Sequence, residues 1–169
     1  MDPDKLRALQ APLKERYKAA PELALIPARA EAVIDQEDIL CRVATHAGTT
    51  WTGLHPAAGG DGSSACSADM LLEALVACAG VTLKAVATAM RIDLKQAKVI
   101  ADGTWDIRGT LAVDRNAPVG LTEIKLKYEI DSTADPKKLQ KMIELTERYC
   151  VIYQTLSQPP AITSELALT

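Results

Sequence analysis

The spacing of apolar residues over the first 45 positions predicts one helix followed by a β-hairpin. In residues 3–20, leucines recur every three or four positions with Lys and Arg between them, which is typical of a short amphipathic helix. A connector with a proline at each end, residues 21–27, follows. Residues 28–34 and 39–45 are both strand-like, and the acidic turn between them predicts that the two pair as a hairpin.

A long loop and a long helix are predicted in the middle of the chain. Residues 48–64 are rich in Gly and Pro and are predicted to be a loop. Ser67 is a suitable N-cap, and Asp69 is well placed in the first turn of the helix that follows. The helix 68–90 is apolar on nearly every face before Lys84, so we expect it to be central and buried.

The second half of the chain is predicted to contain three strands. Residues 99–109 and 111–114 are strand-like segments around a turn. In residues 124–130, Ile, Leu, Tyr and Ile alternate with Lys, Lys and Glu, which predicts a strand with one dry face and one wet face.

A second long helix and a last strand complete the expected order. Asp135 followed by Pro136 is a strong helix start, because it places an N-cap before a proline at the first helical position. This helix is predicted to run through Cys150 toward Leu156, and residues 161–168 can supply a final strand. Antiparallel strands interrupted by two long helices indicate the α+β class, with an antiparallel sheet packed on two long helices.

Composition limits the classes of function. With 169 residues the chain suits one domain with at most a short appended segment. The net charge of −3 with interspersed signs does not indicate a nucleic-acid partner. The charged N-terminus lacks the apolar core of a signal peptide, and the apolar run 74–83 is far short of the ~20 residues of a membrane span. We therefore expect a cytoplasmic protein with no membrane partner, in a compartment where a disulfide is more often catalytic than structural.

The four cysteines are the main candidates for chemistry. Cys78 and Cys150 each lie in an apolar helical stretch, and two thiols that meet in space can cycle between dithiol and disulfide. For Cys78 the alternative is a small buried packing residue. Cys66 directly precedes a helix start and is either a reactive thiol or an ordinary exposed loop residue, and Cys41 is expected in the core.

A metal or other cofactor is not expected. The chain has no C-x-x-C and no H-x-x-x-H spacing, and its Gly-rich stretch 59–62 lacks the Lys and Ser or Thr of a phosphate-binding loop. Trp51 and Trp105 can line an apolar substrate pocket, although simple packing is the default for tryptophan.

The segment 59–78, GGDGSSACSADMLLEALVAC, closely resembles the OsmC/Ohr family of osmotically inducible and organic-hydroperoxide-resistance proteins. That family combines a Gly-rich loop and a Leu-rich helical turn with Ala-x-x-x-Cys, and it has a second cysteine in a later helix, which Cys150 matches. The resemblance covers about residues 28–168. It implies an OsmC-like domain over residues 28–169, preceded by an accessory helix and connector in residues 1–27.

The resemblance also implies a function and a partner. It implies an intertwined homodimer with thiol-dependent peroxidase activity, in which Cys78 is the peroxidatic and Cys150 the resolving cysteine. Oxidation by peroxide followed by disulfide formation requires an external dithiol reductant.

In the hydroperoxide-resistance branch, a Glu and an Arg hold the thiolate. The nearest candidates here are Asp69, one residue beyond the Glu position, and Arg29 before the hairpin, with Arg42 as a second possibility.

Two function classes follow from the sequence. The first is a Cys-based peroxidase that reduces organic hydroperoxides or hydrogen peroxide in oxidative-stress defence. The second is a non-catalytic stress protein that keeps the fold and binds an apolar ligand.

Overall fold

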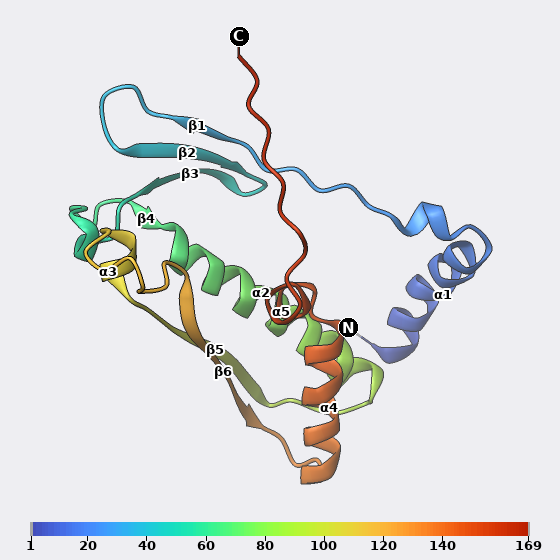
Figure 1. Ribbon diagram of the computed structural model, residues 1–169. Coiled ribbons are helices and arrows are strands. Elements are labelled where there is room, and N and C mark those ends of the chain that lie inside the picture. Colours follow the sequence, from blue (N-terminus) through green and yellow to red (C-terminus); the bar gives the residue numbers. More distant parts are fainter. Residues whose placement is uncertain (1, 169) are drawn as a thin grey trace.

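The computed structural model describes residues 2–168 and combines helices with two separate sheets (Figure 1). The predicted units, residues 1–27 and 28–169, include Met1 and Thr169, which lie outside the described part of the chain. The helices are α1 (Pro3–Ala19), η1 (Pro21–Ala24), η2 (Pro56–Ala58), α2 (Ser67–Ala89), α3 (Ile107–Thr110), α4 (Pro136–Tyr149) and α5 (Val151–Ser157). The strands are β1 (Ala32–Ile34), β2 (Leu40–Thr45), β3 (Gly48–Gly53), β4 (Ala65–Cys66), β5 (Gln96–Trp105) and β6 (Leu121–Asp131). The predicted α+β class is confirmed.

The first sheet has the order β1-β2-β3-β4 and extends away from the helices (Figure 1). The predicted hairpin is confirmed, since β1 and β2 pair antiparallel. The prediction of a loop from residue 48 is wrong for β3, which pairs with β2 from Gly48 to Gly53. Thr and Trp residues, which fit a pleated surface well, fill the interior of β3, and they outweigh the Gly signals at its ends.

The second sheet is the antiparallel pair of β5 and β6, with a register shift between Thr104 and Trp105. The predicted strand 124–130 is confirmed as the main part of β6. The predicted strand 111–114 is wrong. Residues 111–114 instead form turns that follow the short helix α3, and the N–H groups of Leu111 and Val113 donate to carbonyls of that helix. The N-cap of α3, Asp106, accepts hydrogen bonds from the N–H and the guanidinium of Arg108.

Helix α2 is the central packing element. Its fully buried side chains repeat every four residues and so form one stripe, at Leu75, Ala79, Leu83 and Ala87. Leu83 and Ala87 of this stripe form the buried core cluster with Met142 of α4 and with Ile92. The helix is long and apolar enough to cross a membrane, but here it packs on α4, α5 and β5. The expected all-round burial is wrong within one chain, because Val81 is 74% exposed.

The boundaries of the helices differ from the prediction in two places. Cys66, not Ser67, is the N-cap residue of α2, and it makes no side-chain capping bond. The predicted start at Asp135 is confirmed, since its carboxylate accepts hydrogen bonds from the N–H groups of Lys137 and Lys138. The second helix is not continuous: it breaks at Cys150, whose backbone is extended, and α5 follows.

Many apolar side chains near both ends of the chain remain exposed to solvent. Helix α1 is confirmed and joins the body through an ion pair of 2.8 Å between Asp4 and Arg91. Its predicted packing stripe stays largely exposed at Leu9 and Leu13. The predicted last strand, 161–168, is wrong, because these residues belong to no regular element. Three apolar side chains of this tail are more than four-fifths exposed, at Ile162, Leu166 and Leu168.

The cap at Asp135 supports a test of helix stability. Asp135→Ala removes the acceptor of the first N–H groups of α4, so we expect the free energy of unfolding to fall by about 1 kcal/mol. Asp135→Asn keeps an acceptor and is the matched control, with a smaller loss. Urea unfolding followed by circular dichroism measures both, and equal losses in the two variants would contradict a capping role.

Candidate active site at a pair of cysteines

Cys78 and Cys150 meet where α2 packs against the junction of α4 and α5. Cys150 is completely buried, while Cys78 is partly exposed. Cys150 is both the last cap of α4 and the first cap of α5: its N–H donates to the carbonyl of Thr146 at 2.9 Å, and its Sγ accepts from the N–H of Tyr153 at 3.5 Å. The two thiols lie close enough for each to shift the pKa of the other. The structure thus brings together the two cysteines that lie 72 positions apart in the sequence.

The helix break supplies the donors that stabilise a thiolate at Cys78. The first N–H groups of a helix have no partner inside it. Burial raises the pKa of the Cys78 thiol, but hydrogen bonds from the Ile152 N–H, the Cys150 thiol, the Val151 N–H and the Thr82 hydroxyl together lower that pKa below its ordinary value. Cys78 therefore ionises more readily than an ordinary thiol.

Cys150 behaves in the opposite way. Burial raises the pKa of its thiol, and its hydrogen bond to Cys78 and the nearby Cys78 charge raise it further, against the lowering effect of the Tyr153 N–H. The two shifts run in opposite directions, so Cys78 loses its proton more readily than Cys150. This asymmetry suits an attacking thiolate beside a thiol that donates a hydrogen bond to it.

Tyr128 of β6 lies close enough to Cys150 and Glu147 to be affected by their charges. Its hydroxyl is buried and has no hydrogen-bond partner among the described residues. Burial, together with the Glu147 and Cys150 charges, raises the pKa of Tyr128, so the phenol stays protonated. The sequence places Tyr128 only on the dry face of a strand and carries no sign of its proximity to Cys150.

The structure does not bring Asp69 or Arg29 to Cys78 within one chain. Asp69 precedes Cys78 by nine positions on α2, which places it on the opposite face of the helix and about 13 Å away along the axis. Arg29 is exposed and forms an ion pair of 2.8 Å with Glu31. Their predicted roles stay predictions, and the donors around Cys78 come instead from Thr82 and from the start of α5.

The other cysteines lie apart from this pair. Cys41 of β2 is partly buried and its sulfur lies 2.8 Å from the Thr52 hydroxyl across the strand pair. Cys66 is partly buried and lines an apolar cavity with Leu71 and Trp105. Among residues 2–168, no three His, Cys, Asp or Glu side chains form a group that could hold a metal ion.

The family is shown by the comparison with known proteins. Residues 60–165 match the family described as OsmC-like protein. The chain belongs to the OsmC-like family. The match includes both cysteines of the pair and most of α2, α4 and α5. No curated protein sequence matches the chain significantly.

Solved structures share the OsmC-like fold at low identity. An OsmC-like protein from Mycoplasma pneumoniae matches with a TM-score of 0.64 and 19% identity, over 79% of this chain and 89% of its own. An organic hydroperoxide resistance protein from Elizabethkingia anophelis matches with a TM-score of 0.63 and 16% identity, over 79% and 91%. A protein from Legionella pneumophila named organic hydroperoxide resistance protein OsmC, predicted redox protein, matches with a TM-score of 0.61 and 13% identity, over 79% and 93%.

The hydroxyl of Thr82 provides a test of how the thiolate is held. Thr82→Val keeps the branched shape but removes a hydrogen-bond donor, so we expect the pKa of Cys78 to rise. The pH profile of Cys78 alkylation by iodoacetamide, resolved by mass spectrometry, should move to higher pH. Thr82→Ser keeps the hydroxyl and should retain the wild-type profile. A wild-type pH profile in the Val variant would show that the Thr82 hydroxyl does not stabilise the Cys78 thiolate.

Proposed function

We propose that this OsmC-like protein is a Cys-based peroxidase that reduces organic hydroperoxides, with Cys78 as the attacking thiolate and Cys150 as the resolving thiol. The observation that carries the proposal is that Cys78 of α2 lies beside the buried Cys150 at the break between α4 and α5, where the pKa values of the two thiols shift in opposite directions. The names of the Elizabethkingia and Legionella neighbours point the same way.

The first step is attack of the Cys78 sulfur on one oxygen of the peroxide. A sulfur–oxygen bond forms, the O–O bond breaks, and Cys78 becomes a sulfenic acid while the alcohol leaves after taking up a proton. The N–H groups of Val151 and Ile152 favour the thiolate that starts this step. The sulfur is oxidised by two electrons and the peroxide is reduced by two.

The second step joins the two cysteines. The Cys150 sulfur attacks the sulfenic sulfur, a disulfide forms, and hydroxide leaves and takes the Cys150 proton to become water. An external dithiol then restores both thiols by exchange. A reducing cytoplasm supplies such dithiols, and we place the reaction there.

The surroundings of the pair favour an organic substrate. Val81, one turn beyond Cys78 on α2, is 74% exposed, and Val151, next to Cys150, is 68% exposed. These apolar side chains give an alkyl group of a hydroperoxide a surface to contact, which hydrogen peroxide cannot use.

We also propose that the protein works as an intertwined homodimer. A chain of 18.1 kDa has an accessible surface of 12,799 Å², whereas a compact monomer of this mass exposes about 8,100 Å². Exposed apolar side chains gather on the projecting hairpin and on the C-terminal tail. Val33, Ile34 and Ile39 of the hairpin are 51–76% exposed, and Ile162 and Leu166 of the tail are more than four-fifths exposed. An excess of this size suits the area that obligate dimers bury.

The two cysteine variants are expected to fail differently. Cys78→Ser should reduce consumption of cumene hydroperoxide to the uncatalysed rate, because serine is not ionised near neutral pH. Cys150→Ser should react once and leave one added oxygen on Cys78, while the wild type loses two hydrogen atoms as its disulfide forms. Mass spectrometry of peroxide-treated protein distinguishes these products, and Cys66→Ser is the control that should behave as wild type.

Three results would contradict the assignment. Oxygen on Cys66 with Cys78 still a thiol would make the cysteine at the start of α2 the reactive one. An unchanged rate in Cys78→Ser would exclude Cys78 as the nucleophile. If no cysteine reacted at millimolar peroxide, the protein would be a non-catalytic member of the family.

The dimer is tested separately from the chemistry. Light scattering at micromolar concentration should give twice the chain mass of 18.1 kDa. Ile34→Glu on the projecting hairpin should weaken association, because it puts a charge on a surface expected to be buried. A stable monomer of wild-type protein at that concentration would overturn the dimer proposal.

A further inference from the structure

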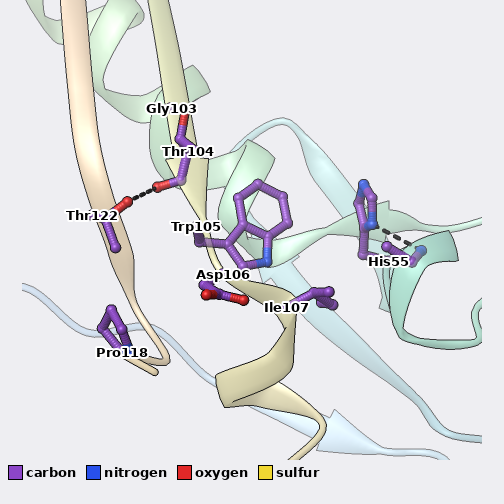
Figure 2. A pocket seen from close by; sticks show the side chains of 9 residues that line it. His55, Gly103, Thr104, Trp105, Asp106, Ile107, Pro118 and Thr122 are labelled. Carbon is purple, nitrogen blue, oxygen red and sulfur yellow. Dashed lines mark hydrogen bonds between the residues drawn. The ribbon is translucent and has the colours of Figure 1, made fainter. Parts of the chain in front are cut away.

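A cavity of the described chain lies away from the cysteine pair. It has a volume of about 720 Å³ and lies between η2, the end of β5 and the start of β6. Figure 2 shows Trp105 extending from β5 toward His55 across this cavity. Neither Cys78 nor Cys150 lines it. This volume is within the range of small-molecule sites in proteins.

An edge-to-face aromatic pair forms one wall of the cavity. The ring centroids of His55 and Trp105 are 5.2 Å apart and the planes meet at 81°. The Nδ1 atom of His55 accepts a hydrogen bond from the N–H of Ala57 at 3.1 Å, so the proton of the neutral ring is on Nε2. His55 therefore offers an N–H donor beside the indole of Trp105.

The cavity carries no unpaired charge. Asp106 is the one charged residue among its lining residues, and its carboxylate binds the Nε of Arg108 at 3.0 and 3.1 Å. The opposite wall is held by the Thr122 hydroxyl, which donates to the carbonyl of Thr104 at 3.0 Å and ties β6 to β5 (Figure 2). A charged ligand would find no free counter-charge here.

A second, mainly apolar cavity adjoins the first at shared lining residues. The second cavity has a volume of about 410 Å³ and shares His55, Trp105 and Ile107 with the first. Its other walls are mainly aliphatic and include Leu54 and Leu71. An apolar ring can thus be buried against Trp105 while a polar group stays at His55.

We infer that this double cavity is a binding site for a neutral aromatic small molecule that carries a carbonyl or hydroxyl oxygen. The aromatic ring lies against Trp105 and the aliphatic wall, and the oxygen accepts a hydrogen bond from the Nε2–H of His55. The site is separate from the proposed thiol chemistry. The cavity and the cysteine pair lie at different parts of α2. Ala68 lines the cavity, and Cys78 lies about 15 Å further along the helix.

The two tryptophans of the chain make a direct test possible with the full-length protein. In ¹⁵N-labelled protein each indole N–H gives one NMR signal, and Trp51→Phe identifies the signal of Trp105. Titration with acetophenone should shift the Trp105 signal with saturation in roughly the millimolar range, as expected for so small a ligand. The Trp51 signal, from β3 outside the cavity, is the internal control and should not shift.

Matched ligands and variants test the chemistry of the site. Cyclohexyl methyl ketone keeps the oxygen but lacks the aromatic ring, and benzoate keeps the ring but carries a charge, so both should bind several-fold more weakly than acetophenone. His55→Asn retains an acceptor for the Ala57 N–H but loses the ring, and it should weaken acetophenone binding by roughly fivefold. Cys78→Ser should leave the titration unchanged.

Each comparison has a result that would overturn the inference. Absence of a saturable Trp105 shift, or equal shifts at Trp51, would show that the cavity is no binding site. Equal affinity for the three compounds, or for His55→Asn and wild type, would remove the assigned ligand chemistry. Loss of acetophenone binding in Cys78→Ser would show that the cavity is part of the thiol site. A wild-type protein without peroxidase activity would contradict the proposed function but not this inference.

Discussion

The packing of α2 against the junction of α4 and α5 determines most of what this protein can do. Leu83 and Ala87 pack α2 against Met142 of α4, and that contact sets the position of Cys78 relative to Cys150. Because Cys150 interrupts the helix, the N–H groups that follow it turn toward Cys78 and not along a continuous helix. The break between α4 and α5 thus places Cys150 beside Cys78 and also provides the N–H groups that favour the Cys78 thiolate.

The same arrangement explains why two similar thiols differ in chemistry. Both cysteines are shielded from water, which disfavours the charged form of either. Hydrogen bonds from Ile152, Val151 and Thr82 outweigh the effect of burial at Cys78. At Cys150 the N–H groups of Tyr153 and Ile152 do not outweigh burial and the effect of Cys78. The thiolate of Cys78 is therefore stabilised by backbone dipoles and hydroxyl groups, with no Arg or carboxylate of the same chain among the groups that lower its pKa.

The chain exposes a large surface with many apolar residues because its first sheet has no layer of the described chain packed on it. A two-stranded sheet such as β5–β6 is only marginally stable alone, and the four-stranded sheet projects from the helices without a covering layer (Figure 1). In the dimer that we propose, burial of this surface by a second chain would add hydrophobic stabilisation. The cavity beside Trp105 differs from these surfaces, because it is concave and contains polar groups with fixed partners.

The sequence by itself determined the elements with strong local signals. The Asp135–Pro136 start, the alternation in residues 124–130 and the apolar length of α2 each depend on contacts within a few positions, and the structure contains all three. The family motif around Cys78 also lies in one continuous stretch. These features need no knowledge of the tertiary fold.

Only the tertiary structure decided the rest. The strand β3 forms because β2 satisfies its backbone. Residues 111–114 are not a strand because the N–H groups of Leu111 and Val113 donate to carbonyls of α3. The C-terminal tail pairs with no strand among residues 2–168. The break at Cys150, the approach of Thr82 and Tyr128 to the thiols, and the meeting of His55 with Trp105 all join residues far apart in sequence. Such contacts arise from the packing of whole elements, and local periodicity carries no information about them.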